Sequence, residues 1–334
     1  MTEANGKGGL DRVLVLEVAR VTEAAAVAAA RLRGRGNEQA ADKAAVEAMR
    51  RELGKLSIRG TVVIGEGERD EAPILYVGEE VGSGEGPEVD IAADPLEGST
   101  ICAKAMPNAL AVLAVAERGG LLRVPALYMN KIAIGPGYPD GVVDLDAPAG
   151  ENLSALAKAK GVAVSEITAC ILDRPRHADL IRAVREAGAA VQLIPDGDIA
   201  GVIWTTDPGE TGIDIYMGAG GAPEGVLAAA ALRCIGGQIQ GRLVVSNDAD
   251  RRRAAAMGID DTRRKYRIED MASADVIFAA TGVTDGSLLD GVHFRGDSAE
   301  TETLVMRAST GTVRRITTSS RAAVSANGPV ARRS

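Results

Sequence analysis

The chain has 334 residues, of which 46% are hydrophobic, 2% are aromatic and 25% are charged, and its formal net charge is −8. The acidic balance argues against a nucleic-acid partner, because a phosphate backbone requires a basic surface. The scarcity of aromatic residues also removes the stacking platforms that bases need. No apolar run approaches the ~20 residues of a membrane-spanning helix, so we expect no membrane partner.

The three cysteines are far apart and odd in number, and none belongs to a C-x-x-C pair. This spacing argues against a disulfide framework or a zinc site, and it favours a reducing compartment. We therefore expect a cytoplasmic protein.

The first half of the chain predicts two helices followed by several strands. Apolar residues recur at helical spacing over 10–32, and a second helix is expected over 37–53 with Asn37 as its cap. Helices followed by strands are typical of an α+β arrangement. The expected strands cover residues 61–64, 89–93, 109–117 and 125–134.

After a segment at 152–160, strands and helices alternate, which is typical of a βαβ domain. Strands are expected at 167–172, 189–194 and 213–217, and helices at 176–187, 198–205 and 223–235. We therefore predict a boundary near residue 165, with a first domain over 10–165 and a second domain over 166–285.

The last part of the chain predicts a helix at 248–257, a strand at 275–280 and a hairpin from 304–308 and 312–318. The sequence leaves open whether residues 285–320 pack back on the first domain. The two ends of the chain, 1–9 and 321–334, are polar or basic, and we predict that they are disordered.

Acidic residues and glycines follow each of the first two expected strands. GEGERDE at 65–71 contains Glu66 and Asp70, which lie on one side if the strand geometry persists. In DPLEGST, Asp94 and Glu97 are three residues apart across a proline turn, so both carboxylates can converge on one or two cations. Ser99 then begins an expected helix, whose free N–H groups favour an anion. Together these features predict metal-assisted phosphate chemistry.

Simpler explanations exist for parts of this pattern. The first acidic cluster is also compatible with a solvated loop, and a plain helix cap would explain Ser99, although not the two acids before it. GAGGAPEG at 218–225 is only similar to a dinucleotide fingerprint, because Pro223 stands at the third glycine. His177 and His293 have no serine or cysteine partner in a motif, so a catalytic triad is unsupported.

Seven motifs, in order, resemble class II fructose-1,6-bisphosphatase, the bacterial manganese-type enzyme of the lithium-sensitive phosphatase superfamily. The similarity covers roughly residues 10–320. The motifs are GRGNEQAADKAAVEAMR, VIGEGERDEAP, DPLEGST, YMNK, RPRH, PDGD and GGAPEG. The resemblance implies a layered αβαβα sugar-phosphatase fold, with a metal-binding α+β domain and a βαβ domain.

The resemblance also implies the reaction, which is hydrolysis of the 1-phosphate of fructose 1,6-bisphosphate in gluconeogenesis or the Calvin cycle. Two divalent ions, Mn²⁺ or Mg²⁺, are expected, and relatives suggest a homodimer or homotetramer. The implied catalytic residues are Asp70, Glu97 and Ser99. The implied metal ligands are Asn37, Glu66, Asp94, Glu97 and Glu224. The implied substrate contacts are Glu97, Gly98, Ser99, Tyr128, Arg174, Pro175, Arg176, Asp196, Gly197, Asp198 and Gly221.

One departure from the family pattern leaves alternatives open. The family usually has an aspartate ligand where this chain has Asn37, and an asparagine carbonyl contributes no charge to a metal site. The chain could therefore be a weaker enzyme or a non-catalytic sugar-phosphate-binding paralogue. Among enzymes, sedoheptulose 1,7-bisphosphate is an alternative or additional substrate. RPRH and GGAPEG argue against an inositol-phosphate or nucleotide phosphatase.

Overall fold

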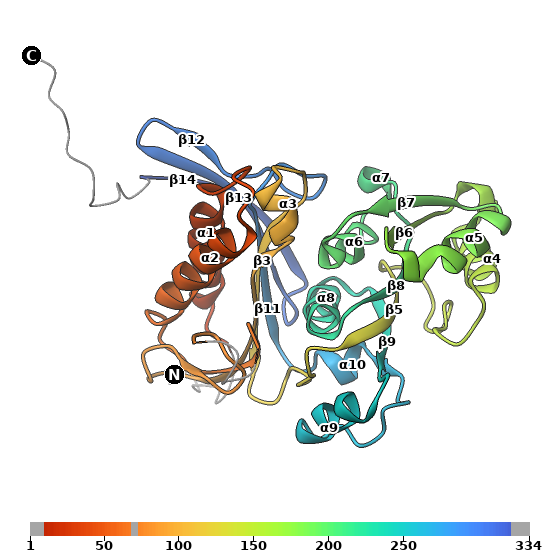
Figure 1. Cartoon of the computed structure of the whole chain (residues 1–334), viewed down its shortest axis with the longest axis horizontal. Helices are drawn as coiled ribbons and strands as arrows, with labels where there is room; N and C mark the ends of the chain where they lie inside the picture. The colour runs from red at the N-terminus through yellow and green to blue at the C-terminus, as the bar shows by residue number, and fades with distance from the viewer. Residues whose placement is uncertain (1–9, 68–72, 322–334) are drawn as a thin grey trace, which may run out of the picture.

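The computed structural model describes residues 10–67 and 73–321, which form five alternating layers of helices and sheets (Figure 1). The helices that define these layers are α1 (Leu14–Ala30), α2 (Glu38–Leu53), α4 (Ala149–Lys160), α5 (Ala178–Glu186) and α8 (Ala222–Ile235). α1 and α2 cover the outer face of the first sheet, α8 lies between the sheets, and α4 and α5 cover the second sheet. This order confirms the mixed α/β class and the αβαβα layers that the motifs implied.

The first sheet contains eight of the described strands, in the order β12-β13-β11-β4-β3-β1-β2, with β14 also paired to β13. Its strands are β1 (Arg59–Ile64), β2 (Glu80–Val81), β3 (Glu88–Glu97), β4 (Leu110–Glu117), β11 (Val276–Gly282), β12 (His293–Arg295), β13 (Ser298–Arg307) and β14 (Thr312–Arg321). β1 and β3 are parallel, and the other pairs are antiparallel. The carboxyl ends of β1 and β3 therefore lie at the same edge of the sheet.

The second sheet contains six of the described strands, in the order β10-β9-β5-β8-β6-β7. They are β5 (Tyr128–Ile134), β6 (Thr168–Leu172), β7 (Ala190–Ile194), β8 (Ile215–Gly221), β9 (Gln238–Val244) and β10 (Tyr266–Arg267). β6 runs parallel to both β7 and β8, as expected for a βαβ unit, and the remaining pairs are antiparallel.

Several short helices connect these elements. They are α3 (Ser99–Ala103), η1 (Val164–Glu166), η2 (Pro175–His177), α6 (Asp198–Trp204), α7 (Pro208–Thr211), α9 (Asp248–Ala256) and α10 (Ile268–Met271). α3 follows β3, η2 follows β6 and α6 follows β7, so each begins beyond the carboxyl end of a strand. This is the edge of an α/β sheet at which ligands bind.

α8 is apolar on all sides because both of its faces are covered by a sheet. Ten of its 14 residues are buried, and five of these are alanine. A helix that is hydrophobic all round belongs in the interior, and its small side chains allow the two sheets to lie close to it. α8 begins directly after β8, so Glu224, in its first turn, is held at the start of this buried helix.

The sheets do not divide the chain at the boundary that we predicted. β5 lies before residue 165 but belongs to the second sheet, and β11 lies before residue 285 but belongs to the first. The hairpin of β13 and β14 extends the first sheet. This part of residues 285–320 therefore packs with the strands of the first half of the chain. The division into domains itself stays a prediction. Of the ends predicted to be disordered, 1–9 and 321–334, Arg321 is instead the last residue of β14, and the rest lie outside the described residues.

Candidate active site

A polar cavity of about 510 Å³ lies between the carboxyl ends of β1 and β3 and the loops of the second sheet. It brings together residues from motifs that are up to 180 positions apart in the sequence. Twelve of the residues implied by the resemblance line it. They are Glu66, Asp94, Glu97, Gly98, Ser99, Tyr128, Arg174, Arg176, Asp196, Asp198, Gly221 and Glu224.

Two irregularities in the first sheet direct the acids toward this cavity. The pairing of β1 with β3 shifts register between Val62 and Ile64, two residues before Glu66. The pairing of β3 with β4 shifts between Asp94 and Glu97. A bulge bends its strand and re-aims the side chains beside it. The proline turn in DPLEGST is therefore part of a bulged strand end, and it brings Asp94 and Glu97 to the same cavity.

The Glu66 loop is anchored by its own backbone. Glu66 N–H donates to the Leu75 carbonyl at 2.9 Å, and the Leu75 N–H donates to the Glu79 carboxylate, which also pairs with Arg50 of α2. A Cβ at Gly65 would lie only 2.0 Å from the Leu75 carbonyl oxygen. Only glycine therefore fits where this loop crosses the end of β1.

Glu97 connects the two halves of the cavity. One carboxylate oxygen accepts the Ile199 N–H at 2.8 Å, in the first turn of α6. The other oxygen is buried and has no hydrogen-bond partner among the described residues, and the same is true of Glu224 Oε2. A buried carboxylate oxygen without a partner is costly, so both side chains are suited to a cation in the cavity.

A buried ion pair lies near Glu224. Lys131 donates to Asp198 Oδ2 at 2.5 Å and to the Gly221 carbonyl at 2.9 Å, and the Tyr216 hydroxyl donates to the same Asp198 oxygen at 3.2 Å. A Cβ at Gly221 would lie 1.9 Å from Glu224 Oε2. The glycine is therefore required because the Glu224 carboxylate occupies the space beside it.

The acidic side chains in the cavity raise one another's pKa. Desolvation, followed by the nearby charge of Asp42, raises the pKa of Glu66 to about 7. Desolvation and the charge of Glu224 raise the pKa of Asp94 well above its usual value, and desolvation and Asp94 do the same for Glu97. Desolvation also raises the pKa of Glu224, with Asp198 as the next cause. Like charges gathered in a poorly solvated site favour either protonation or a bound cation.

These residues fit hard divalent cations, which take oxygen ligands, carboxylates above all. Two observations support this fit. Glu97 and Glu224 each have a buried carboxylate oxygen without a partner, and the neighbouring carboxylates raise the pKa of Asp94. Within residues 10–67 and 73–321, no three acidic, histidine or cysteine side chains converge closely enough to hold an ion as they stand. Mutual repulsion of the carboxylates is a sufficient cause for this spacing.

Two arginines provide the opposite charge in the same cavity, and a tyrosine packs against one of them. The Arg176 guanidinium lies over the Tyr128 ring at 4.6 Å from its centroid, and it donates to the Ala219 carbonyl from Nε at 3.1 Å and Nη2 at 2.7 Å. Arg174 lies 3.8 Å from Asp196. Planar guanidinium groups bind phosphate oxygens in a bidentate manner, so this group is suited to an anionic substituent.

Asn37 does not line the cavity. Its exposed side chain caps α2 by accepting the Ala40 N–H at 3.0 Å, which is the simpler role that an asparagine before a helix can take. Asp42, one turn further along α2, lines the cavity instead and raises the pKa of Glu66. The signal in the sequence was the acid at a position of α2 that lies on the same face as buried Ala45 and Val46, three and four residues later.

Two other implied residues, Pro175 and Gly197, are not among the described residues that line the cavity. Pro175 and Gly197 lie beside the arginines and Asp198 and shape the turns that carry them. Gly197 has φ +81°, and the equivalent Gly98 before Ser99 has φ +83°, a conformation that favours glycine. Asp70 lies outside the described residues.

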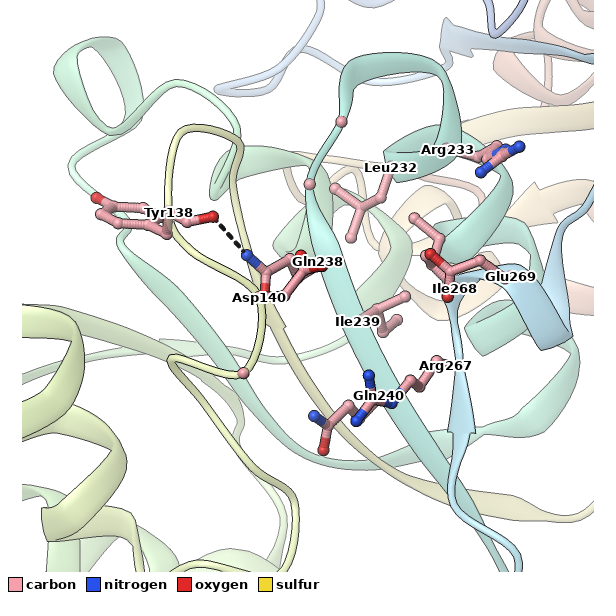
Figure 2. A pocket seen from close by; sticks show the side chains of 13 residues that line it. Tyr138, Asp140, Leu232, Arg233, Gln238, Ile239, Gln240, Arg267, Ile268 and Glu269 are labelled. Atoms are coloured by element: carbon pink, nitrogen blue, oxygen red, sulfur yellow. Dashed lines mark hydrogen bonds between the residues drawn. The ribbon is translucent and has the colours of Figure 1, made fainter. Parts of the chain in front are cut away.

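A second pocket, of about 240 Å³, lies beside β9 and the end of α8 (Figure 2). Gln238 crosses it and donates to the Tyr138 carbonyl at 2.9 Å, and the Arg233 side chain points away from Arg267. Neither of the buried carboxylate oxygens that lack a partner lies here. This pocket therefore lacks the convergent charge of the larger cavity.

Comparison with known proteins identifies the family. Residues 12–320 match the family described as "Bacterial fructose-1,6-bisphosphatase, glpX-encoded". The chain belongs to this family. The activity of the chain is the hydrolysis of fructose 1,6-bisphosphate, so the chain is a phosphoric monoester hydrolase. This confirms the reaction that the motifs implied.

Two similar proteins come from cyanobacteria, and both are named D-fructose 1,6-bisphosphatase class 2/sedoheptulose 1,7-bisphosphatase. The protein of Synechococcus sp. (strain JA-3-3Ab) is 46% identical over 334 aligned residues, which cover 92% of this chain and 96% of the relative. That of Synechococcus sp. (strain RCC307) is 47% identical over 311 residues, covering 89% and 92%. None of the helices described in this fructose-1,6-bisphosphatase is long and apolar enough to span a membrane.

Proposed function

We propose that this fructose-1,6-bisphosphatase releases the 1-phosphate with two divalent cations, Mn²⁺ or Mg²⁺, held by Asp42, Glu66, Asp94, Glu97 and Glu224. The observation that carries this proposal is the group of desolvated carboxylates in one cavity, two of which have a buried oxygen without a partner. Asp42 replaces Asn37 in the ligand set. The loss of charge at Asn37 is therefore no reason to expect an inactive paralogue.

Bound divalent ions would shield the phosphate charge and lower the pKa of the attacking water. The residues of the chain position the other participants. Ser99 lines the cavity at the first position of α3, where its hydroxyl can orient that water. Glu97, fixed by its bond to Ile199 N–H, holds its second oxygen toward the same space. A role for Asp70 stays a prediction from the resemblance.

Arg174, Arg176 and Tyr128 hold the remote 6-phosphate in this proposal. Their geometry supports it, because Arg176 is already oriented by the Ala219 carbonyl and by the Tyr128 ring. Asp196, Asp198 and Gly221 line the same cavity and offer acceptors for the sugar hydroxyl groups between the two phosphates. Interactions with a group that does not react should affect binding more than turnover.

Sedoheptulose 1,7-bisphosphate is a second candidate substrate, because two similar proteins carry that activity in their names. The cavity volume of about 510 Å³ leaves room for a sugar of either length. We also propose that the enzyme is a cytoplasmic homo-oligomer that serves gluconeogenesis or the Calvin cycle.

The test is phosphate release by the purified protein from each bisphosphate, with Mn²⁺, with Mg²⁺ and with a chelator. We expect release that requires metal, from fructose 1,6-bisphosphate first. Release that persists after exhaustive chelation would contradict the metal proposal. No release with any metal, from protein shown to be folded, would support the binding paralogue instead.

A further inference from the structure

His177 is a buried residue that the reaction described above does not use. It ends η2, next to Arg176, and is 3% exposed. The only other histidine in the sequence is His293, which lies in β12 and is exposed. A buried histidine beside a substrate-binding arginine therefore needs a physical explanation of its own.

Both ring nitrogens of His177 are engaged by backbone groups. Nδ1 lies 2.7 Å from the Leu172 carbonyl, which can only accept, so Nδ1 must carry a proton. Nε2 accepts the Ala219 N–H at 2.8 Å, so Nε2 must be unprotonated. The surroundings therefore select the neutral ring and one of its two tautomers.

The backbone N–H and carbonyl of Ala219 connect this histidine to Arg176. The N–H is bound by His177, and the carbonyl accepts two bonds from the Arg176 guanidinium. Ala219 lies in β8 opposite Asn130 of β5, two residues along from Tyr128, on whose ring Arg176 lies. The backbone of one residue thus joins the end of β6, the arginine and the strand that carries the tyrosine.

The chain makes room for this contact at Gly218. A Cβ there would lie 3.1 Å from His177 Nε2 and 3.2 Å from the neighbouring ring carbon, which is closer than most such contacts. Gly218 also has φ +140°, which L side chains rarely adopt. The backbone at this point is therefore shaped to place the Ala219 N–H against the imidazole.

We propose that His177 is a positioning residue for substrate binding: it fixes the backbone N–H of Ala219, and the carbonyl of the same residue in turn orients the Arg176 guanidinium for the remote phosphate. This inference rests on the proposed role of Arg176. It assigns His177 no contact with the substrate and no part in the transfer of protons during hydrolysis.

Protonation of His177 would break this arrangement, because two N–H groups would then face each other at Ala219. Burial is the main cause that lowers the pKa of His177; Arg176 and Arg174 lower it further, whereas the bond to Leu172 and the charge of Asp198 raise it. The neutral ring therefore persists at neutral pH. Substrate affinity should weaken only as the pH falls below the usual histidine range.

The first experiment compares His177→Leu with His177→Gln. Leucine keeps much of the volume but cannot accept the Ala219 N–H, so we expect KM for fructose 1,6-bisphosphate to rise about tenfold or more while kcat stays within about threefold. The glutamine oxygen can accept that N–H, so His177→Gln should keep most of the affinity. A loss of kcat with unchanged KM in His177→Leu would overturn the proposal, because it would indicate only a smaller folded fraction.

Product inhibition locates the effect. The inhibition constant for fructose 6-phosphate should rise in His177→Leu by the same factor as KM, because this product retains the remote phosphate. The inhibition constant for inorganic phosphate at the metal site should change little. Equal weakening of both inhibitors would contradict a role that acts through Arg176.

A double-mutant cycle with Arg176→Ala tests the route directly. If His177 acts through Arg176, His177→Leu should add less than about twofold to the KM of Arg176→Ala; independent, multiplicative effects would overturn the proposal.

A pH series tests the need for the neutral ring. At acidic pH, with saturating metal, the inhibition constant for fructose 6-phosphate should rise in the wild type. This rise should vanish in His177→Gln and persist in the control His293→Gln. An inactive wild-type protein would refute the proposed function. An active enzyme in which the effects of His177→Leu and Arg176→Ala on KM are independent would refute only this inference.

Discussion

The cavity contains two groups of charged residues that are built in opposite ways. The acidic group (Asp42, Glu66, Asp94, Glu97 and Glu224) gathers carboxylates whose charges repel, and two of them leave an oxygen without a partner. The arginine group (Arg174, Arg176 and Tyr128) is already oriented, by Asp196, by the Ala219 carbonyl and by the contact between Arg176 and Tyr128. The acidic group requires a cation to be complete, whereas the arginine group is preorganised for an anion.

This difference separates turnover from affinity. Interactions that develop in the transition state change kcat, and interactions that are equal in the ground and transition states change KM. We assign the first kind to the acidic group and the second kind to the arginine group. Each prediction below tests one of the two groups, through kcat, through KM or through the affinity for the metal.

Asp94→Asn should have the largest effect. The amide keeps the size but removes the charge from the centre of the acidic group, so kcat should fall at least about 10³-fold at saturating metal. Glu88→Gln, at the exposed start of the same strand, is the matched control and should be close to wild type. An Asp94→Asn enzyme with more than a few per cent of wild-type kcat would refute the assignment.

Asp42→Asn and Asn37→Asp form the second test, on a single helix. Asp42→Asn should raise the metal concentration for half-maximal activity by about 10–100-fold, because it removes a charged oxygen ligand. Asn37→Asp should change it less than about twofold, because Asn37 caps α2 away from the cavity. Metal titrations of activity measure both. The reverse order of effects would restore Asn37 as the ligand.

Arg176→Ala should raise KM about tenfold or more and leave kcat nearly unchanged, because the remote phosphate loses a charge-assisted contact. Arg182→Ala, exposed on α5, is the control and should alter neither parameter. Initial rates over a range of fructose 1,6-bisphosphate concentrations separate the two parameters. A large loss of kcat would place Arg176 with the acidic group.

The pH dependence of metal binding should give the smallest effect. The pKa of Glu66 is raised to about 7 without metal, so protons compete with the cation below this pH. The dissociation constant for Mn²⁺ should rise up to about tenfold for each pH unit below 7. The raised pKa favours folding of the metal-free protein at low pH, and this contribution is lost as the pH rises through about 7. Calorimetric titrations with Mn²⁺ at several pH values would check this, and a flat profile would contradict it.

The sequence predicted most of the long elements because their signals are local, whereas the layers were implied by the family resemblance. α1, α2 and α8 follow from apolar periodicity, and β1, β3, β4 and β11 from apolar runs. The sheet to which β5 or β11 belongs was not predictable in the same way, because the partners of a strand depend on contacts with residues far along the chain. The shortest strands, β2 and β10, exist only because a neighbouring strand pairs with them.

The site was predictable as motifs but not as geometry. The acids of DPLEGST and the arginines of RPRH were identified from their sequences, yet the bulge at Asp94 and Glu97 required the pairing of β3 with β4. Asp42 was missed because its role depends on which face of α2 meets the end of β1. The contact of His177 with Ala219 also joins segments that no local pattern relates.

The most direct test of this account is anomalous diffraction from crystals soaked in Mn²⁺. We predict one or two strong peaks within about 2.5 Å of carboxylate oxygens of Asp42, Glu66, Asp94, Glu97 or Glu224. Peaks beside Asn37 or elsewhere, with none in this cavity, would contradict the central claim that the acidic group binds the catalytic cations.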